Sequence, residues 1–190
     1  MGVVILIATA ALAENIVLAK MLGLCPFIGL SRRLDVAAGV GLATTLVLTF
    51  ATVIAWCADT WLLGDFKAAR PLVLIAAAAS LVQSAELLMR TFATRMHRML
   101  GVYLPLIATN CAVLGVMLTA VQTSPDSLLG AFALGLGGGL GFMLAVICLA
   151  SIRGRMVESL APEVMRGAPL TMLTAGWMAL SFSGLAGVFS

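Results

Sequence analysis

Long apolar runs constrain this chain more than any other feature. Six runs can be read, over residues 2–22, 38–58, 71–89, 99–121, 128–150 and 169–188. Each is close to the roughly 20 residues that a helix needs to cross the hydrocarbon core of a bilayer. The runs lack the period-two alternation of barrel strands, and backbone polar groups inside a bilayer must be satisfied within the protein. The sequence therefore predicts an all-helical polytopic membrane protein, and its 62% apolar and 10% charged residues exclude an ordinary soluble fold.

The basic residues predict how the helices are oriented. Nine of the 11 Lys and Arg residues gather around the connections that follow the first, third and fifth runs, whereas Lys67 and Arg70 follow the second run. Cytoplasmic connections are enriched in Lys and Arg. We therefore expect both termini on the outer, non-cytoplasmic face. Since the net charge of +3 reflects this topology, it does not indicate a nucleic-acid partner.

Two cysteine segments suggest that the chain is an internal duplication. Cys25 in GLCPFIG and Cys111 in TNCAVLG each precede a glycine by four residues. We expect a single membrane domain over residues 1–190, with one repeat over about 1–95 and a second over about 96–190. Three spans per repeat place the second repeat upside down relative to the first. The architecture expected is a 3+3 inverted repeat, in which the two cysteines occupy corresponding positions.

Helix-breaking residues flank both cysteines. Gly23 and Pro26 surround Cys25, and Pro105 precedes Cys111 by six residues. Interrupted helices in matching halves of a membrane protein often mark its binding site. The pattern predicts breaks in the first and fourth helices, with Pro26 at the first position of a new helical segment.

The paired cysteines have three readings from the residues alone: a metal or redox site, simple packing, or a disulfide. Cys57 and Cys148 have no matching motif and are expected to be packing residues. Zinc is disfavoured because the one histidine, His97, lies in a basic segment. Haem is disfavoured because the chain has neither Cys-x-x-Cys-His nor a pair of membrane histidines. Two thiolates supply half of the four that a [2Fe-2S] cluster takes.

Glu14 and Asn15 are polar residues within the first apolar run. An ionisable side chain inside a membrane is by default a candidate for a proton or ion path. The same two residues can also be neutral groups that hydrogen-bond to a neighbouring helix. The sequence leaves both readings open.

Three motifs extend the interpretation: LGLCPFIGL at 22–30, GVGLATT at 39–45 and PLIATNCAVLGV at 105–116. With them the chain resembles the A subunit of the Rnf electron-transport complex, and it is similar to the E subunit of the sodium-pumping NADH:quinone reductase. The resemblance covers nearly the whole chain.

The resemblance implies a six-helix subunit of the bacterial inner membrane, with both termini on the periplasmic side. It would pair with a homologous, oppositely oriented subunit, each giving two cysteines to one intramembrane [2Fe-2S] cluster. Cys25 and Cys111 match the ligand positions, and the segments around Pro26 and Asn110 would supply nearby hydrogen-bond donors. The family complex passes electrons between ferredoxin and NAD and couples this transfer to Na⁺ or H⁺ movement. Other subunits of such a complex carry iron-sulfur clusters and flavins.

No flavin is expected on this chain, because it has no Ser-Gly-Ala-Thr attachment stretch. Two alternatives remain. The chain can be the equivalent subunit of the sodium-pumping reductase, or it can be a small transporter or channel subunit in which the cysteines only pack.

Overall fold

The computed structural model describes most of the chain, and most of the described residues lie in helices. The described residues are 2–12, 15–30, 34–62, 72–73, 75–77, 79–80, 83, 110–123, 127–156, 162 and 166–189, and they contain no strand. This confirms the all-helical prediction for that part of the chain. The third predicted span, 71–89, lies largely outside the described residues, as does the start of the fourth, so the six-span inverted repeat stays a prediction.

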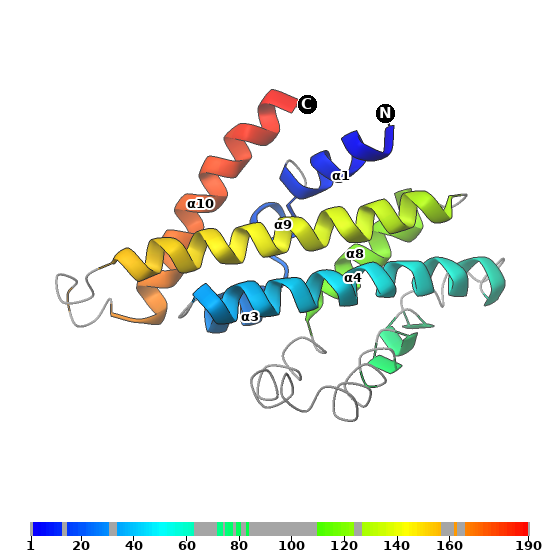
Figure 1. Ribbon diagram of the computed structural model, residues 1–190, viewed down its shortest axis with the longest axis horizontal. Coiled ribbons are helices and arrows are strands. Elements are labelled where there is room, and N and C mark those ends of the chain that lie inside the picture. The colour runs from blue at the N-terminus through cyan, green and yellow to red at the C-terminus, as the bar shows by residue number, and fades with distance from the viewer. Residues whose placement is uncertain are drawn as a thin grey trace.

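Two long helices form the centre of the molecule. Helix α4 (Leu34–Leu62) and helix α9 (Leu128–Arg155) run side by side in opposite directions (Figure 1). Within the described residues they are the two helices that are long and apolar enough to cross a membrane. Glycines of α9 allow the close crossing: a Cβ atom at Gly139 would lie 2.7 Å from the Cα atom of Thr45 in α4. Such small residues let membrane helices approach each other closely.

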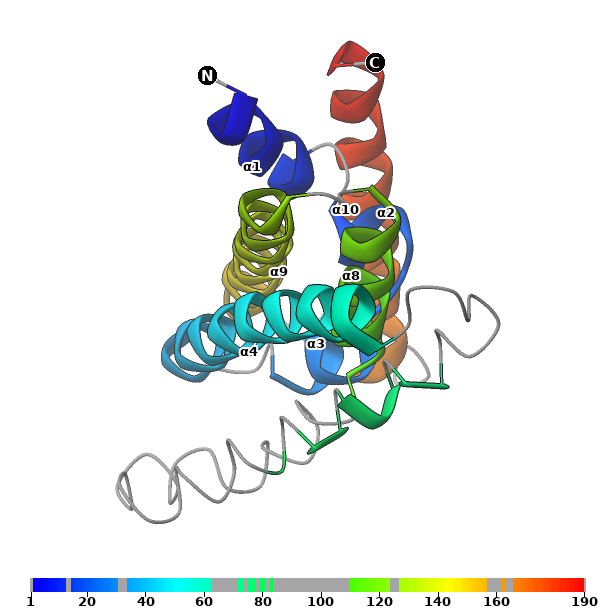
Figure 2. The same cartoon turned by 90° about the vertical axis from the view of Figure 1, so that its right-hand side faces the viewer.

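The opposite side of α9 is covered by helix α1 (Gly2–Leu12), so that α9 lies between α1 and α4 (Figure 2). This second crossing also depends on glycine. A Cβ at Gly137 would lie 3.0 Å from the Ile7 carbonyl oxygen, and one at Gly141 would lie 2.8 Å from the Ala11 carbonyl oxygen. The glycines between 137 and 141 therefore allow close contact with both α1 and α4, because successive positions in a helix point to different sides.

The first apolar run is not one helix. Helix α1 ends at Leu12, a single turn α2 covers Ile16–Ala19, and after a turn at residues 20–23 helix α3 covers Leu24–Leu30. The predicted break before Cys25 is therefore present, and a second break at Asn15 was not predicted. Lys20, which was expected with the basic connection, ends α2 and lines a small hollow together with Val116 and Thr119.

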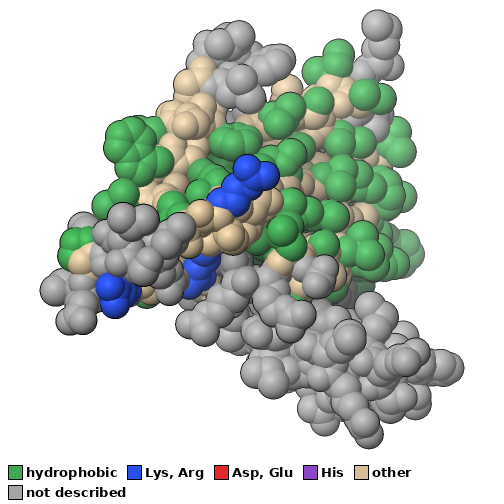
Figure 3. All heavy atoms as spheres, turned by 60° about the vertical axis from the view of Figure 1, so that its left-hand side comes forward, with side chains coloured by type: hydrophobic (Ala, Val, Ile, Leu, Met, Phe, Trp, Pro, Cys, Tyr) green, Lys and Arg blue, Asp and Glu red, His purple; other side chains and the backbone are tan. Residues whose placement is uncertain are grey.

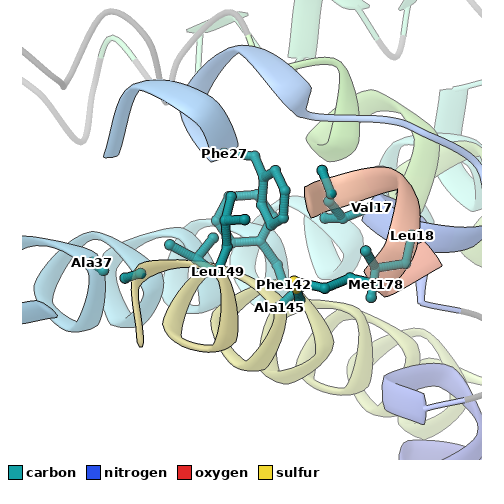
Figure 4. Close-up of a cluster of buried hydrophobic side chains, with 11 residues drawn as sticks. Val17, Leu18, Phe27, Ala37, Phe142, Ala145, Leu149 and Met178 are labelled. Atoms are coloured by element: carbon teal, nitrogen blue, oxygen red, sulfur yellow. The ribbon is translucent and has the colours of Figure 1, made fainter. Parts of the chain in front are cut away.

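Helices α8 (Cys111–Thr123) and α10 (Ala168–Phe189) complete the described bundle. One buried cluster joins α2, α3, α4, α9 and α10, and Figure 4 shows how Phe27 of α3 faces Phe142 and Leu149 of α9, next to Val17 of α2. All four of these side chains are at most 1% exposed. This cluster fixes the broken first segment against α9.

The outer surface of the bundle is apolar. Large hydrophobic side chains cover much of the face shown in Figure 3, and Lys and Arg are visible at only a few places. Exposed apolar residues occur on every long helix, among them Val4, Phe50, Trp61, Leu129, Trp177 and Leu180. A soluble monomer rarely shows contiguous apolar surface of this kind, whereas a lipid-facing surface requires it.

Candidate functional site

The two predicted cysteine segments come together in the structure. The backbone N–H of Gly23 donates a hydrogen bond to the Sγ atom of Cys111, with an N–S distance of 3.0 Å. Gly23 lies two residues before Cys25, which is the second residue of α3, and Cys111 is the first residue of α8. A contact between residues 88 positions apart thus brings the segment that carries Cys25 to the Cys111 thiol. Cys111 is a free, exposed cysteine.

The turn before α3 requires glycine at position 23. Gly23 has a φ of +84°, and a Cβ atom there would lie 2.9 Å from the Oδ1 atom of Asn110 and 3.0 Å from the Cβ atom of Ala112. Any other residue would combine an unfavourable backbone conformation with a steric clash.

Asn110 lies on the Cys111 side of the contact between Gly23 and Cys111. Its Oδ1 atom accepts a hydrogen bond from the Ala112 N–H at 3.0 Å, which satisfies one of the free donors at the start of α8. Asn110 is only 4% exposed, and its Nδ2 atom has no hydrogen-bond partner among the described residues. A buried amide donor without a partner is costly. Next to Cys111 it is a donor that a negatively charged group at this site would satisfy.

Asn15 has the same local geometry as Asn110 at the break in the first apolar run. Its Oδ1 atom accepts a hydrogen bond from the Val17 N–H at 3.2 Å, and its Nδ2 atom donates to the carbonyl oxygens of Gly141 at 2.9 Å and Ala11 at 3.2 Å. Asn15 is 2% exposed. The amide therefore caps α2 and ties the break to α9. Glu14, its predicted partner in an ion path, lies outside the described residues, and the ion path stays a prediction.

Replacing Asn15 with leucine is expected to destabilise the protein. The change removes the cap on Val17 and the link to the Gly141 carbonyl, which together are worth about 1–3 kcal/mol. Thermal unfolding of the purified protein in detergent measures the loss. Asn15→Ser retains an oxygen that can cap α2 and should fall between leucine and wild type. Equal stability of the leucine variant and wild type would show that these hydrogen bonds contribute nothing.

Cys57 and Cys148 were predicted to be packing residues, and Pro26 was predicted to lie near the ligands. Cys57 is exposed on α4, and Cys148 is half-buried among apolar residues of α9 and α10. Pro26 is the third residue of α3 rather than its first, because the helix begins at Leu24. It still lies in the first turn, where a missing N–H breaks no helical hydrogen bond. Within the described ranges no three His, Cys, Asp or Glu side chains come together to bind a metal ion.

Sequence reasoning missed two contributors to this site. Gly23 contributes its backbone N–H, and a sequence shows only that the residue is a glycine, not where its N–H points. Arg153, near the end of α9, donates from Nη1 to the Ile28 carbonyl oxygen of α3 at 3.3 Å. No local signal could have indicated that contact, because the two residues are 125 positions apart.

Comparison with known proteins agrees with the resemblance seen in the motifs. Residues 3–189 match the family described as "Rnf-Nqr subunit, membrane protein". A protein of Glaesserella parasuis serovar 5, named as the A subunit of an ion-translocating oxidoreductase complex, is 42% identical over 187 residues, covering 97% of this chain and 96% of its own length. Proteins of the same name from Cereibacter sphaeroides and Citrobacter koseri are 44% and 41% identical, covering 96% and 97% of this chain and 95% and 96% of their own lengths. The chain therefore belongs to the Rnf-Nqr family of membrane subunits.

Proposed function

We propose that this chain is the electron-relay membrane subunit of an ion-translocating ferredoxin:NAD oxidoreductase of the Rnf type. In this proposal Cys25 and Cys111 are half of the ligands of a [2Fe-2S] cluster, and an oppositely oriented homologous subunit provides the other half. The observation that carries the proposal is the Gly23–Cys111 hydrogen bond, which joins the two cysteine segments. Family membership and the relatives' shared name support it.

The donors around Cys111 fit a negatively charged cluster. Hydrogen bonds to ligand sulfurs and to their surroundings tune the potential of an iron-sulfur centre and orient its ligands. The Gly23 N–H already donates to the Cys111 sulfur, and the buried Nδ2 atom of Asn110 is still free to donate within the described part of the chain. Two cysteines are half of the four ligands that a [2Fe-2S] cluster takes, and this is why we propose a cluster shared between two subunits.

Such a cluster would supply one-electron chemistry within the bilayer. The residues of this chain would hold it, surround it with apolar helices and donate hydrogen bonds to its thiolates. In the proposal electron transfer is coupled to movement of Na⁺ or H⁺, and Glu14 and Asn15 are the candidate residues for an ion path. Pro26 and Asn110 would act around the ligands rather than as ligands.

The proposed setting is the bacterial inner membrane, with multiple spans and both termini on the periplasmic side. The relatives are named as one subunit of a complex, which supports further subunits, and we propose that these carry the iron-sulfur clusters and flavins at the two ends of the relay. This chain would hold neither flavin nor haem. The family also includes the Nqr branch by its name, so the equivalent position in a sodium-pumping NADH:quinone reductase is the second candidate.

Visible absorption of the purified complex tests the proposal against a transporter that has no redox role. A complex that contains the cluster is coloured and bleaches when dithionite is added. Cys25→Ser should remove the part of the absorption due to this cluster and lower iron and acid-labile sulfide by two atoms each per complex. Wild-type and Cys25→Ser complexes with the same iron content and the same spectrum would exclude the cluster.

A further inference from the structure

Helix α3, which carries Cys25, has few attachments of its own. It contains seven residues, and a helix this short is marginal without tertiary contacts. Phe27 is fully buried in the cluster with Phe142 and Leu149 (Figure 4). At its start, the Gly23 carbonyl accepts a hydrogen bond from the Phe27 N–H at 3.2 Å, and the Gly23 N–H donates to Cys111. These contacts hold the first half of α3.

The other end of α3 is held by Arg153. Its Nη1 atom donates to the Ile28 carbonyl oxygen at 3.3 Å. That oxygen is one of the last four carbonyls of α3, which lie beyond the regular hydrogen bonds of a helix and need other donors. A cation at this end also interacts favourably with the negative end of the helix dipole. Arg153 lies in the last turn of α9 and is half-buried, whereas Arg155 in the same turn is exposed.

Arg153 therefore connects α9 with the Cys25 segment. Cys25 lies three residues before Ile28, roughly 4.5 Å along the helix axis. Over so short a distance an α-helix moves as a unit, so a shift at the Ile28 end also shifts Cys25. Ligand positions in a working site must be held to within about 0.5 Å. The Gly23 contact fixes one end of α3, and the tilt of the helix against α9 depends on the apolar packing of Leu24, Phe27 and Ile28 and on the Arg153 hydrogen bond.

We propose that Arg153 is a positioning residue that sets the place of Cys25 relative to Cys111. The inference rests on the proposed function only for what this placement serves, which is to hold a cluster ligand. The placement itself is a property of the chain. Arg153 would act through the α3 backbone, to which it donates at the Ile28 carbonyl oxygen. Lysine at this position keeps the charge but not the planar guanidinium group, and glutamine keeps a donor but not the charge.

Disulfide formation between Cys25 and Cys111 tests the placement without depending on the cluster. The purified complex is stripped of iron, Cys57 and Cys148 are replaced with serine, and copper(II)–phenanthroline is added as the oxidant that takes up the two electrons. Mass spectrometry of the Cys25–Cys111 peptide pair gives the rate. We expect Arg153→Gln to change this rate several-fold and Arg153→Lys to restore part of it. Arg155→Gln, the matched loss of charge in the same turn, should leave the rate unchanged.

The intact complex provides the second readout. Arg153→Gln should shift the EPR g-values and the midpoint potential of the [2Fe-2S] signal, with Arg153→Lys in between and Arg155→Gln at the wild-type values. Equal cross-linking rates in wild type, Arg153→Gln and Arg155→Gln would overturn the positioning role. If Arg153→Gln does not assemble, wild-type behaviour of Arg153→Lys in both readouts would overturn it as well. Arg153-dependent cross-linking, together with a wild-type complex that shows no [2Fe-2S] signal as purified, before it is stripped of iron, would support the placement and refute the proposed function.

Discussion

Cys111→Ser is expected to abolish the proposed electron transfer between reduced ferredoxin and NAD⁺ in membranes that contain the complex. Serine keeps the size of the side chain but replaces the soft thiolate, which iron-sulfur clusters require, with a hydroxyl. Loss of residues that merely surround a metal site already costs about 10–100-fold, so loss of a ligand should reduce the rate at least as much. The rate of ferredoxin-dependent NAD⁺ reduction measures the effect.

The chain provides matched controls for this substitution. Cys57 is also an exposed cysteine, and Cys148 is half-buried in α9. Cys57→Ser and Cys148→Ser are expected to keep most of the wild-type rate. In the described part of the structure, Cys111 is the cysteine whose sulfur accepts a hydrogen bond from the turn before α3. A Cys111→Ser complex that assembles and transfers electrons at the wild-type rate would contradict the proposed role of this residue.

Gly139→Ala is expected to cause a large loss of stability for the addition of a single methyl group. The added Cβ would lie 2.7 Å from both the Cα and the Cγ2 atom of Thr45. Since the Thr45 Cα belongs to the backbone of α4, the two central helices must move apart. Overpacking of this kind costs about 1–3 kcal/mol. The midpoint temperature of thermal unfolding in detergent should fall accordingly.

Gly154 is the control, because it lies in the same helix and a Cβ there would meet nothing within 4 Å in the described structure. Alanine is a better helix former than glycine by roughly 1 kcal/mol, so Gly154→Ala should be neutral or slightly stabilising. If Gly139→Ala and Gly154→Ala unfold at the same temperature, the close crossing of α4 and α9 does not depend on glycine at 139.

The sequence predicted where apolar helices lie better than where they end. Residues 128–150 were expected as a span, and α9 extends to Arg155; residues 38–58 were expected, and α4 covers Leu34–Leu62. Hydropathy marks the segment that lies in hydrocarbon, whereas the helix continues through polar residues at the interface. The break at Asn15 could not be predicted this way. The Asn15 amide caps α2 and donates a hydrogen bond to the Gly141 carbonyl, 126 residues away in the sequence.

The candidate site, too, could be predicted from the sequence only in part. The helix-breaking residues around Cys25 predicted the break, and the cysteine motifs predicted that the two segments belong together. Those motifs did not reveal the asparagine caps. Asn15 and Asn110 are 95 positions apart, whereas Cys25 and Cys111 are 86 apart, so the caps and the cysteines do not share one repeat register. Cys111 directly follows its capping asparagine, whereas α2 and a turn separate Asn15 from the helix that carries Cys25.

Low-temperature EPR of the dithionite-reduced, purified complex tests the central claim most directly. Wild type is compared with Cys25→Ser and, separately, with Cys111→Ser, after the subunit composition of each complex has been verified. We predict that one [2Fe-2S] signal present in wild type is absent from both variants, while the signals of the other clusters remain. An unchanged spectrum in both assembled variants would contradict a cluster held by Cys25 and Cys111.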